Sequence, residues 1–335
     1  MSRYLVTGGC GFIGSHVVER LLERGDAVRV LDNFDPFYDR RTKEANLAQA
    51  FARSEACAGD FAFVEGDLRE PTAVARATEG CDGIVHLAAL AGVRPSIERP
   101  VDYWDVNLTG TQCLLNAALD RAKVEGRKLR FVFGSSSSVY GGNDKVPFHE
   151  DDPVLAPVSP YAATKRSGEL QCSTFHHLTG VPVSCLRFFT VFGPRQRPEM
   201  AIHKFTRMIE DGQEIPMFGD GSSSRDYTFV SDIVDGVLAA LDRCGNGQHP
   251  GFRIYNLGGA ATTTLRELID TIGKALGKEP RVQQLPDQPG DVPRTFADVS
   301  RAAAELDYSP KVPVAEGIPR FVEWYRDARQ KGEIA

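Results

Sequence analysis

A tyrosine and a lysine four residues apart form the pair in this sequence that is best suited to acid–base chemistry. Tyr161 and Lys165 begin a predicted helix, and their spacing places the phenol and the ammonium on one helix face. A tyrosine ordinarily titrates near pH ~10, and a nearby positive charge favours its phenolate. We therefore expect Lys165 to lower the pKa of Tyr161 and make it a usable general base.

Four consecutive serines, Ser135–Ser138, follow a predicted strand over Leu129–Gly134. Doubly wound sheets bind their ligands at the carboxyl ends of the strands, so these hydroxyls should project into a ligand site. A serine in this position can hydrogen-bond to a reacting oxygen and relay its proton.

Three glycines near the N-terminus, Gly8, Gly11 and Gly14, form a G-x-x-G-x-x-G motif between a predicted strand and a predicted helix. The missing side chains permit a tight turn and let a pyrophosphate approach the helix N-terminus. Asp32 ends the next predicted strand, where a carboxylate can accept hydrogen bonds from an adenosine ribose and would repel a 2′-phosphate. The combination predicts a dinucleotide site that prefers NAD to NADP.

The elements that position these residues alternate between short apolar runs and helical patterns. We expect strands at Tyr4–Thr7, Ala27–Leu31, Phe61–Glu65, Gly83–Leu87, Leu129–Gly134 and Val183–Phe188. Helices are expected at Phe12–Arg24, Thr72–Thr78, Val101–Leu119 and Tyr161–Leu178. This alternation predicts an α/β fold of the Rossmann type, a doubly wound parallel sheet covered by helices on both faces.

The spacing changes from about Gly193, where Pro/Gly-rich connections separate shorter elements. We expect an NAD-binding domain over residues 1–192 and a smaller α/β lobe, mainly for substrate, over residues 193–335. Residues 227–258 should be woven back onto the large sheet through Tyr227–Gly236 and Ile254–Leu257.

Composition argues against several classes of protein. The formal net charge of −6 is spread along 335 residues without a run of like charges, so a nucleic-acid partner is not expected. No window reaches the ~18 apolar residues of a membrane span, and no cleavable leader is apparent.

Seven scattered cysteines without a C-x-x-C pair indicate reduced thiols and a cytoplasmic protein. The histidines that invite a metal or acid–base interpretation, His16, His86 and His149, have no ligand spacing, so packing or capping roles and no metal are expected.

Several motifs together resemble the extended short-chain dehydrogenases/reductases, and within them the UDP-sugar 4-epimerases, over nearly the whole chain. They are TGGCGFIGSH from Thr7, Asp32-Asn33, GDL from Gly66, HLAA from His86, Asn107, SSSSVYG from Ser135, Tyr161-x-x-x-Lys165 and RDY from Arg225. The resemblance implies a homodimer built through the helices Val101–Leu119 and Tyr161–Leu178 as a four-helix bundle.

The resemblance also implies roles for individual residues. Ser136 would be the catalytic hydroxyl beside Tyr161 and Lys165, Arg225 would neutralise the substrate pyrophosphate, and Asp291 would hold its ribose. The residues implied to bind NAD are Gly8, Gly11, Phe12, Ile13, Gly14, Asp32, Asn33, Asp67, Leu68, Leu87, Ala88, Ala89, Asn107, Tyr161 and Lys165. Those implied to bind substrate are Arg94, Ser136, Ser137, Ser138, Tyr161, Thr190, Arg197, Phe218, Arg225 and Asp291.

The serine run favours epimerisation over related reactions. The similar 4,6-dehydratases have Thr-Asp-Glu where this chain has Ser136-Ser137-Ser138, and the UDP-glucuronate decarboxylases have a glutamate at the position of Ser138. The implied reaction begins as Tyr161 removes the C4 hydroxyl proton, through or beside Ser136, while a hydride passes to NAD. The 4-keto sugar then rotates in the site, and its other face is reduced.

Similarity is closest to the UDP-glucuronate 4-epimerases, in DNFDPFYDRR from Asp32, AGVRPS from Ala91, RFFTVFGPRQRPEMA from Arg187 and QPGDVPRTFAD from Gln288. The chain departs from UDP-glucose 4-epimerases at Ala91, Thr190 and Gln288. We expect Ser138, Thr190 and Arg197 to receive the C6 carboxylate, with Arg94 and Arg195 ranked lower. The open alternatives are a UDP-glucose or UDP-N-acetylglucosamine 4-epimerase, a UDP-glucuronate decarboxylase and a non-catalytic NAD-binding regulator.

Overall fold

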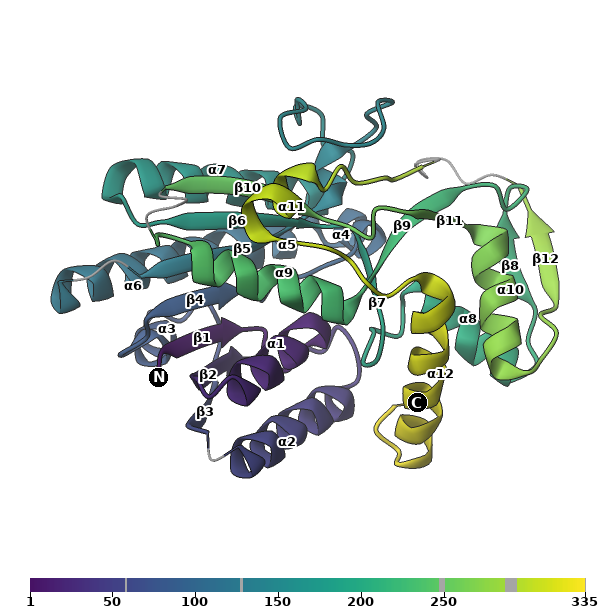
Figure 1. The fold of residues 1–335 in the computed structure, drawn as a ribbon, viewed down its shortest axis with the longest axis horizontal. Helices are drawn as coiled ribbons and strands as arrows, with labels where there is room; N and C mark the ends of the chain where they lie inside the picture. The colour runs from purple at the N-terminus through teal and green to yellow at the C-terminus, as the bar shows by residue number, and fades with distance from the viewer. Residues whose placement is uncertain (58, 127–128, 247–250, 287–293, 335) are drawn as a thin grey trace.

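A seven-stranded parallel sheet forms the centre of the protein in the computed structural model, which describes residues 1–57, 59–126, 129–246, 251–286 and 294–334 (Figure 1). The strand order is β10-β6-β5-β4-β1-β2-β3. The bounds are β1 (Arg3–Thr7), β2 (Ala27–Asp32), β3 (Phe61–Glu65), β4 (Gly83–His86), β5 (Arg130–Ser136), β6 (Val183–Phe188) and β10 (Phe252–Leu257). This order and direction confirm the predicted Rossmann-type sheet.

Helices cover both faces of the sheet because its strands alternate their side chains between two apolar cores. In β1, Tyr4 and Val6 belong to one core and Leu5 to the other. The first core includes α1 (Phe12–Glu23) and α9 (Val230–Arg243), with α2 (Arg40–Ala56) packed against α1. The second core includes α3 (Pro71–Thr78), α6 (Gly110–Glu125) and α7 (Pro160–Thr179).

One expected helix is built in three consecutive pieces. The segment predicted as Val101–Leu119 consists of α5 (Pro100–Trp104), a π-helical turn over Asp105–Thr109, and α6. A π-helical turn holds one residue more than an α-helical turn, and such turns are frequent at functional sites. Asn107, expected to support the active site, lies in this turn and is buried.

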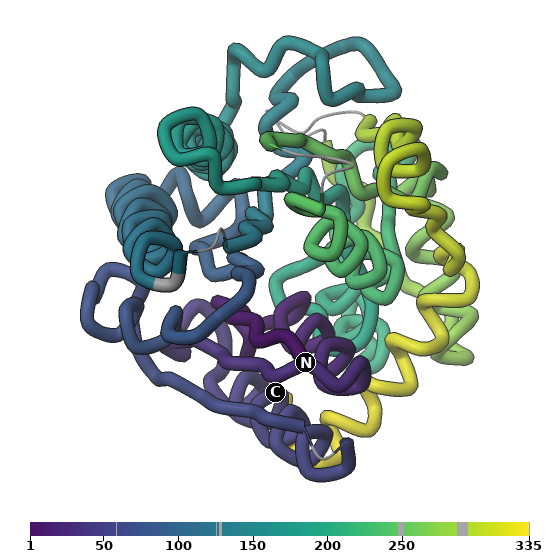
Figure 2. The backbone as a smooth tube through the Cα atoms, turned by 60° about the vertical axis from the view of Figure 1, so that its left-hand side comes forward, coloured from purple at the N-terminus to yellow at the C-terminus, as the bar shows by residue number. Residues whose placement is uncertain are grey.

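Helix α2 was not expected from the sequence. Its inward face carries Thr42, Lys43, Asn46, Ala50 and Ser54, and most of these residues are polar, so no apolar period marks it. Thr42 Oγ1 donates to the carbonyl oxygen of Glu333 at 2.9 Å, which ties the C-terminal end of the chain to this helix (Figure 2).

Most of the remaining elements form a smaller lobe beside the carboxyl ends of the strands (Figure 1). Two small sheets contain β7 (Thr190–Phe192), β9 (Ser224–Phe229) and β11 (Thr262–Thr264), and β8 (Ile215–Phe218) with β12 (Val282–Leu285). Four further helices are α4 (Val93–Glu98), which packs on α7, and α8 (Ala201–Glu210), α10 (Leu265–Leu276) and α12 (Val314–Gln330) of the lobe. Helix α11 (Ser300–Leu306) packs on α9 and β10.

The segment 227–258 divides between the two parts of the molecule. Strand β10 pairs with β6 and becomes the seventh strand of the large sheet, and α9 covers one face of that sheet. Strand β9, in contrast, pairs with β7 and β11 in the small sheet. The expected return to the large sheet therefore begins after β9, and the domain division at residue 192 stays a prediction.

No helix within the described ranges combines the length and the apolar character that crossing a membrane requires.

Candidate active site

A cavity of about 820 Å³ lies at the carboxyl ends of the strands, between the large sheet and the smaller lobe. Its walls come from the ends of β2, β5 and β6, from the loops after β1, β3 and β4, from α7, and from the lobe residues Arg197, Met200, Arg225 and Thr295. Doubly wound sheets bind ligands at this position, and the volume is that of a site for a cofactor and a substrate.

The glycine turn between β1 and α1 has no room for side chains. A Cβ on Gly14 would lie 2.1 Å from the carbonyl oxygen of Gly8, and Gly8 itself has φ +70° and would place a Cβ 2.8 Å from Ala88 N. Helix α1 then starts at the cavity wall without a side-chain cap. Uncapped N–H groups at a helix start attract an anionic group such as a pyrophosphate.

Asp32 ends β2 at the cavity and is held by the backbone. Its Oδ2 accepts a hydrogen bond from Cys10 N at 3.1 Å, and its Oδ1 accepts one from Phe34 N at 2.9 Å. Burial raises the pKa of this carboxyl, while the Phe34 N–H opposes the rise. The carboxylate is therefore fixed in direction, as recognition of a ribose requires.

A second carboxylate lies close by after β3. Asp67 accepts a hydrogen bond from Asn33 Nδ2 at 2.9 Å and two from the Arg69 side chain at 2.8 Å. The hydrogen bonds from Arg69 lower the pKa of Asp67 to about 2. Asn33, Asp67 and Leu68 form the wall of the cavity beyond Asp32.

Helix α7 carries Tyr161 and Lys165 into the cavity wall. Ser159 caps this helix through its Oγ, which accepts from Ala162 N at 3.1 Å, and Pro160 occupies the first turn. Lys165 Nζ donates to the carbonyl oxygen of Gly134 at 2.7 Å. Burial lowers the pKa of Lys165 to about 8, so its ammonium begins to lose its proton in the physiological range.

The pKa of Tyr161 is raised in the protein, whereas the sequence led us to expect that Lys165 lowers it. Burial raises it above its ordinary value, and the Ser136 hydroxyl and the charge of Arg197 oppose that rise only in part. Burial is thus the largest effect on the pKa of this phenol, and the protein alone does not bring the phenol toward neutral pH.

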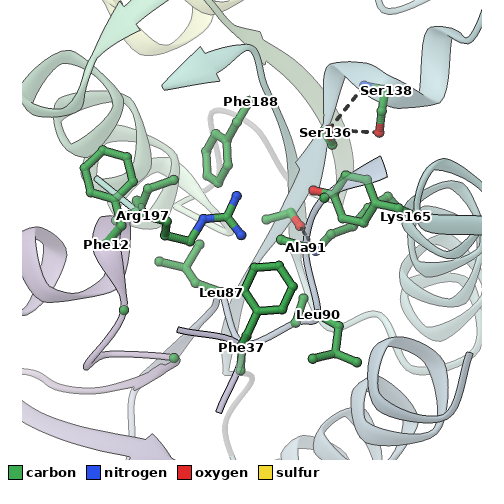
Figure 3. Close-up of a pocket in the computed structure, with 18 of the residues that line it drawn as sticks. Phe12, Phe37, Leu87, Leu90, Ala91, Ser136, Ser138, Lys165, Phe188 and Arg197 are labelled. Carbon is green, nitrogen blue, oxygen red and sulfur yellow. Dashed lines mark hydrogen bonds between the residues drawn. The ribbon is translucent and has the colours of Figure 1, made fainter. Parts of the chain in front are cut away.

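The serine run forms the wall opposite Arg197, as Figure 3 shows. Ser136 Oγ accepts hydrogen bonds from Ser138 N at 3.2 Å and from Ser138 Oγ at 3.0 Å. Ser136 also lowers the pKa of Tyr161 against the effect of burial, and both residues line the cavity. Ser137, next in the run, also lines the cavity.

Asn107 does not line the cavity but connects two of its walls. Its Nδ2 donates to Leu90 O and to Thr164 Oγ1, both at 3.0 Å, and its Oδ1 accepts from Leu90 N at 2.8 Å. The loop after β4, whose residues Leu87, Ala88 and Ala89 line the cavity, is thereby fixed to α7.

Most residues expected to bind substrate line the cavity, namely Arg94, Thr190, Arg197 and Arg225 with the serines and Tyr161. The guanidinium of Arg197 extends between Phe188 and Phe37 in Figure 3, with its Cζ 5.7 Å from the centre of the Phe37 ring. Its Nη1 lies 3.2 Å from Oε1 of Glu199.

Three expectations for substrate residues differ from the structure or lie outside it. Phe218, at the end of β8, is not among the described residues that line the cavity, because its strand lies in the far two-stranded sheet. Arg195 is buried and pairs with Glu19 at 2.7 Å, so its guanidinium is withdrawn from the cavity. Asp291 lies outside the described residues.

Three cavity residues from the segment after β2 were not predicted from the sequence as site residues. Phe37, Tyr38 and Lys43 line the cavity, and Lys43 Nζ lies 4.6 Å from the centre of the Tyr38 ring. Among the described residues, the buried Tyr38 hydroxyl has no hydrogen-bond partner. The available signal was the stretch DNFDPFYDRR, whose aromatic residues directly follow Asp32.

The buried histidines have structural surroundings. His86 lies between two threonines, with Nδ1 2.7 Å from Thr7 Oγ1 and Nε2 2.9 Å from Thr111 Oγ1, and burial lowers its pKa to about 3. His16 Nε2 lies 3.0 Å from Pro194 O. In the part of the chain that the structure describes, no three His, Cys, Asp or Glu side chains come together as metal ligands.

Comparison with known proteins agrees with this geometry. Residues 4–258 match the NAD dependent epimerase/dehydratase family. The chain is 40% identical to a probable UDP-glucuronate 4-epimerase of Rhizobium meliloti (strain 1021), with 96% of each chain covered.

Two solved structures are similar over nearly the whole chain. One is the UDP-glucuronic acid 4-epimerase of Bacillus cereus in complex with UDP-glucuronic acid and NAD, at 32% identity and a TM-score of 0.86, covering 97% of this chain and 99% of that one. The other is a dTDP-glucose 4,6-dehydratase of Streptomyces venezuelae with NAD bound, at 36% identity and a TM-score of 0.86, covering 98% of each chain. The chain belongs to the NAD dependent epimerase/dehydratase family.

Proposed function

We propose that this protein is an isomerase, a UDP-glucuronate 4-epimerase that uses tightly bound NAD. The observation that carries the proposal is the composition of one cavity: a dinucleotide turn, the Tyr161–Lys165 pair and a serine run without a carboxylate all line it. Similarity to UDP-glucuronate 4-epimerases over nearly the full length supports the same substrate.

The residues at the start of α1 and the end of β2 fit a dinucleotide. The turn would collide with any side chain on Gly14, the helix start is uncapped, and the Asp32 carboxylate has a fixed direction. When bound there, NAD supplies the acceptor for a hydride from C4 of the sugar and later returns that hydride. The proposed contacts are Gly8, Gly11, Phe12, Ile13, Gly14, Asp32, Asn33, Asp67, Leu68, Leu87, Ala88 and Ala89 with Tyr161 and Lys165, and Asn107 supports them.

The catalytic residues proposed are Tyr161, Ser136 and Lys165. Tyr161 takes the proton of the C4 hydroxyl, and the Ser136 hydroxyl hydrogen-bonds to the reacting oxygen. The phenol has a raised pKa in the protein alone, so the phenolate depends on positive charge that arrives with the cofactor and on Lys165. The same tyrosine returns the proton when the keto sugar is reduced on its other face.

The distribution of carboxylates favours epimerisation over elimination of water. Among the described residues that line the cavity, the carboxylates are Asp32, Asp35 and Asp67, which lie at the end of β2 or in the loops after β2 and β3. A dehydratase requires an acid and a base beside the sugar, whereas the wall beside Tyr161 offers only serine hydroxyls. The decarboxylase alternative is disfavoured in the same way, because Ser138 occupies the position of its glutamate.

For the sugar, we propose that Ser138, Thr190 and Arg197 receive the C6 carboxylate. All three line the cavity, and Arg197 reaches it across from the serines (Figure 3). A 4-keto hexuronate is a β-keto acid, which loses CO₂ unless its carboxylate is restrained. Hydroxyls and a guanidinium supply such restraint. Arg225, and Asp291 from outside the described residues, remain proposed for the UDP part.

We further propose a homodimer through α5, α6 and α7. Large apolar side chains on this surface are exposed, with Val101 and Leu178 each 75% accessible, and Trp104 and Leu170 also accessible. Burying such a patch against a second copy would remove it from water. Light scattering on the purified protein checks this proposal, and a monomer at micromolar concentration contradicts it.

A cytoplasmic location is proposed because the seven cysteines are scattered along the sequence without a C-x-x-C pair, a pattern that a reducing compartment favours. The negative net charge supports the proposal of no nucleic-acid partner.

Proton NMR of the purified protein with UDP-glucuronate and catalytic NAD tests the function, with parallel samples of UDP-glucose and UDP-N-acetylglucosamine. UDP-galacturonate forming fastest, without a UDP-pentose, is the expected result. Turnover of only a neutral sugar would overturn the hexuronate assignment but keep the epimerase. Loss of CO₂ as the main reaction would indicate a decarboxylase, and no turnover would favour an NAD-binding regulator.

A further inference from the structure

The carboxylate of Glu169 accepts four hydrogen bonds and is completely withdrawn from solvent. Its Oε1 accepts from Ser135 Oγ at 2.7 Å and from Arg187 Nε at 2.8 Å. Its Oε2 accepts from Arg187 Nη2 at 2.9 Å and from Arg166 Nη1 at 3.0 Å. A buried carboxylate requires this degree of pairing, and the four donors hold it in one place.

Three of these four hydrogen bonds come from two residues on the strands that deliver residues to the cavity. Ser135 directly precedes Ser136 at the end of β5, and Arg187 directly precedes Phe188 at the end of β6. The register of the two strands sets Ser135 opposite Arg187, so their side chains point to the same face of the sheet. On that face both meet Glu169 of α7.

Helix α7 lies against β5 over three successive strand residues. Gly168 permits the close approach, because a Cβ there would lie 2.4 Å from the ring of Phe133. Lys165 Nζ is bonded to the carbonyl oxygen of Gly134, and Glu169 is bonded to Ser135. Since Tyr161, Lys165 and Glu169 recur every fourth residue, they share the helix face that looks onto this strand.

We propose that Glu169 is a positioning residue, whose carboxylate holds the ends of β5 and β6 against α7 and thereby fixes Ser136 relative to Tyr161. Glu169 is not among the described residues that line the cavity, so it acts through Ser135 and Arg187. The kinetic part of this inference rests on the proposed function, whereas the geometric part does not.

The charge of Glu169 raises the pKa of Lys165 against the effect of burial, so the ionisation of that lysine gives a second readout of Glu169 besides kcat. The other titratable groups around Lys165 are Cys172 and Tyr161 on α7 and His86 from β4, and His86 is neutral at pH 7. The charged or ionisable neighbours of Glu169 are Lys165 and Arg166 on its own helix and Arg187 and Cys185 from β6.

The test compares Glu169→Gln with wild type in the presence of NAD. Glutamine keeps the shape but removes the charge, so kcat for UDP-glucuronate should fall by about 10- to 100-fold while KM changes little, as expected for misplaced reacting groups. The alkaline limb of the kcat profile should also move to lower pH, because Lys165 then loses its proton more easily.

Ser135→Ala is the second variant, in case loss of the charge beside Arg187 prevents folding. It removes one hydrogen bond and no charge, so kcat should fall by roughly 2- to 10-fold with no shift of the alkaline limb. Glu316→Gln, in an exposed pair with Arg320 on α12, makes the same chemical change at a distance and should leave kcat and the profile unchanged.

A measurement that needs no turnover separates this inference from the proposed function. In protein carrying ¹³C at the lysine ε position, the Lys165 signal, identified by its absence in Lys165→Arg, should titrate at lower pH in Glu169→Gln than in wild type. If wild type does not epimerise UDP-glucuronate but this shift appears, the proposed function fails and the inference stands. If Glu169→Gln has wild-type kcat and an unchanged Lys165 titration, the inference is overturned.

Discussion

The rings of Tyr103 and Tyr161 meet edge to face, with their centres 6.3 Å apart and their planes at 84°. Tyr103 is buried on α5, and its hydroxyl donates to the carbonyl oxygen of Ala91 at 2.8 Å. Such ring pairs are worth about 1 kcal/mol beyond simple burial. The Tyr161 ring therefore keeps a packing partner that does not depend on its own hydroxyl.

This contact makes Tyr161→Phe a clean test of the proposed general base. The variant should retain its fold, because the ring still packs against Tyr103, while kcat at saturating NAD falls by at least about 10²-fold. Circular dichroism and the NMR turnover assay measure the two quantities. A kcat within a few-fold of wild type would show that another group removes the proton.

The pH dependence of kcat should follow Lys165. Its pKa is lowered to about 8, and the ammonium form is the one that favours the Tyr161 phenolate. The active form is thus present below pH 8 and is lost as the pH rises through that value. Initial rates between pH 6 and 10 at saturating UDP-glucuronate measure this limb, and a flat profile up to pH 10 would contradict the assigned role of Lys165.

Replacing Asp32 should change the choice of cofactor. In Asp32→Asn the ribose loses a charged acceptor, so NAD affinity should fall by about 10-fold or more, and the ratio of NADP to NAD affinity should rise as repulsion of the 2′-phosphate disappears. The melting temperature should also fall, since an amide replaces one of the oxygens that accept from Cys10 N and Phe34 N. Calorimetric titration with both cofactors is the measurement.

Asp270→Asn, at an exposed position on α10, is the matched control for Asp32→Asn and should leave both affinities unchanged. An unaltered preference for NAD in Asp32→Asn would mean that another group excludes the 2′-phosphate.

Replacing Arg197 should change substrate binding, whereas replacing Arg195, two positions earlier, should change stability. Arg197→Met should raise the KM for UDP-glucuronate about 10-fold or more with little effect on UDP-glucose, and should increase loss of CO₂, because Arg197 faces the cavity. Arg195→Met should leave the preference among sugars unchanged but lower the stability by about 3 kcal/mol, because it leaves the carboxylate of Glu19 without its ion pair.

Substrate kinetics of both variants measure the change in KM, and urea unfolding measures the change in stability. Equal losses of affinity for the two sugars in Arg197→Met would remove Arg197 from the proposed carboxylate site.

The sequence predicted the parallel sheet well because each strand is a short apolar run between turn signals. The cofactor turn was also predictable, since glycine is required where a Cβ would collide with Gly8. Helix α2 was missed for the opposite reason: its buried face is polar, with Lys43 and Asn46 turned inward, and therefore shows no apolar period.

Other features depend on contacts between distant segments. The sequence alone could not separate Arg195 from Arg197, because the partner that withdraws Arg195 from the cavity, Glu19, lies on α1. The raised pKa of Tyr161 reflects burial under several elements, which a four-residue spacing to Lys165 does not reveal. The place of Tyr38 in the cavity wall is apparent only from the structure, in which its hydroxyl faces the glycine turn.

The pairing of β10 with β6 has a consequence for the way the protein forms during synthesis. A nascent chain that ends at residue 192 would contain every strand of the large sheet except β10, so β6 would expose its edge, and the apolar face that α9 covers would be open to water. Such a fragment is prone to aggregate rather than to bind NAD independently. We therefore expect the large sheet to reach its stable form only after residue 257 has left the ribosome.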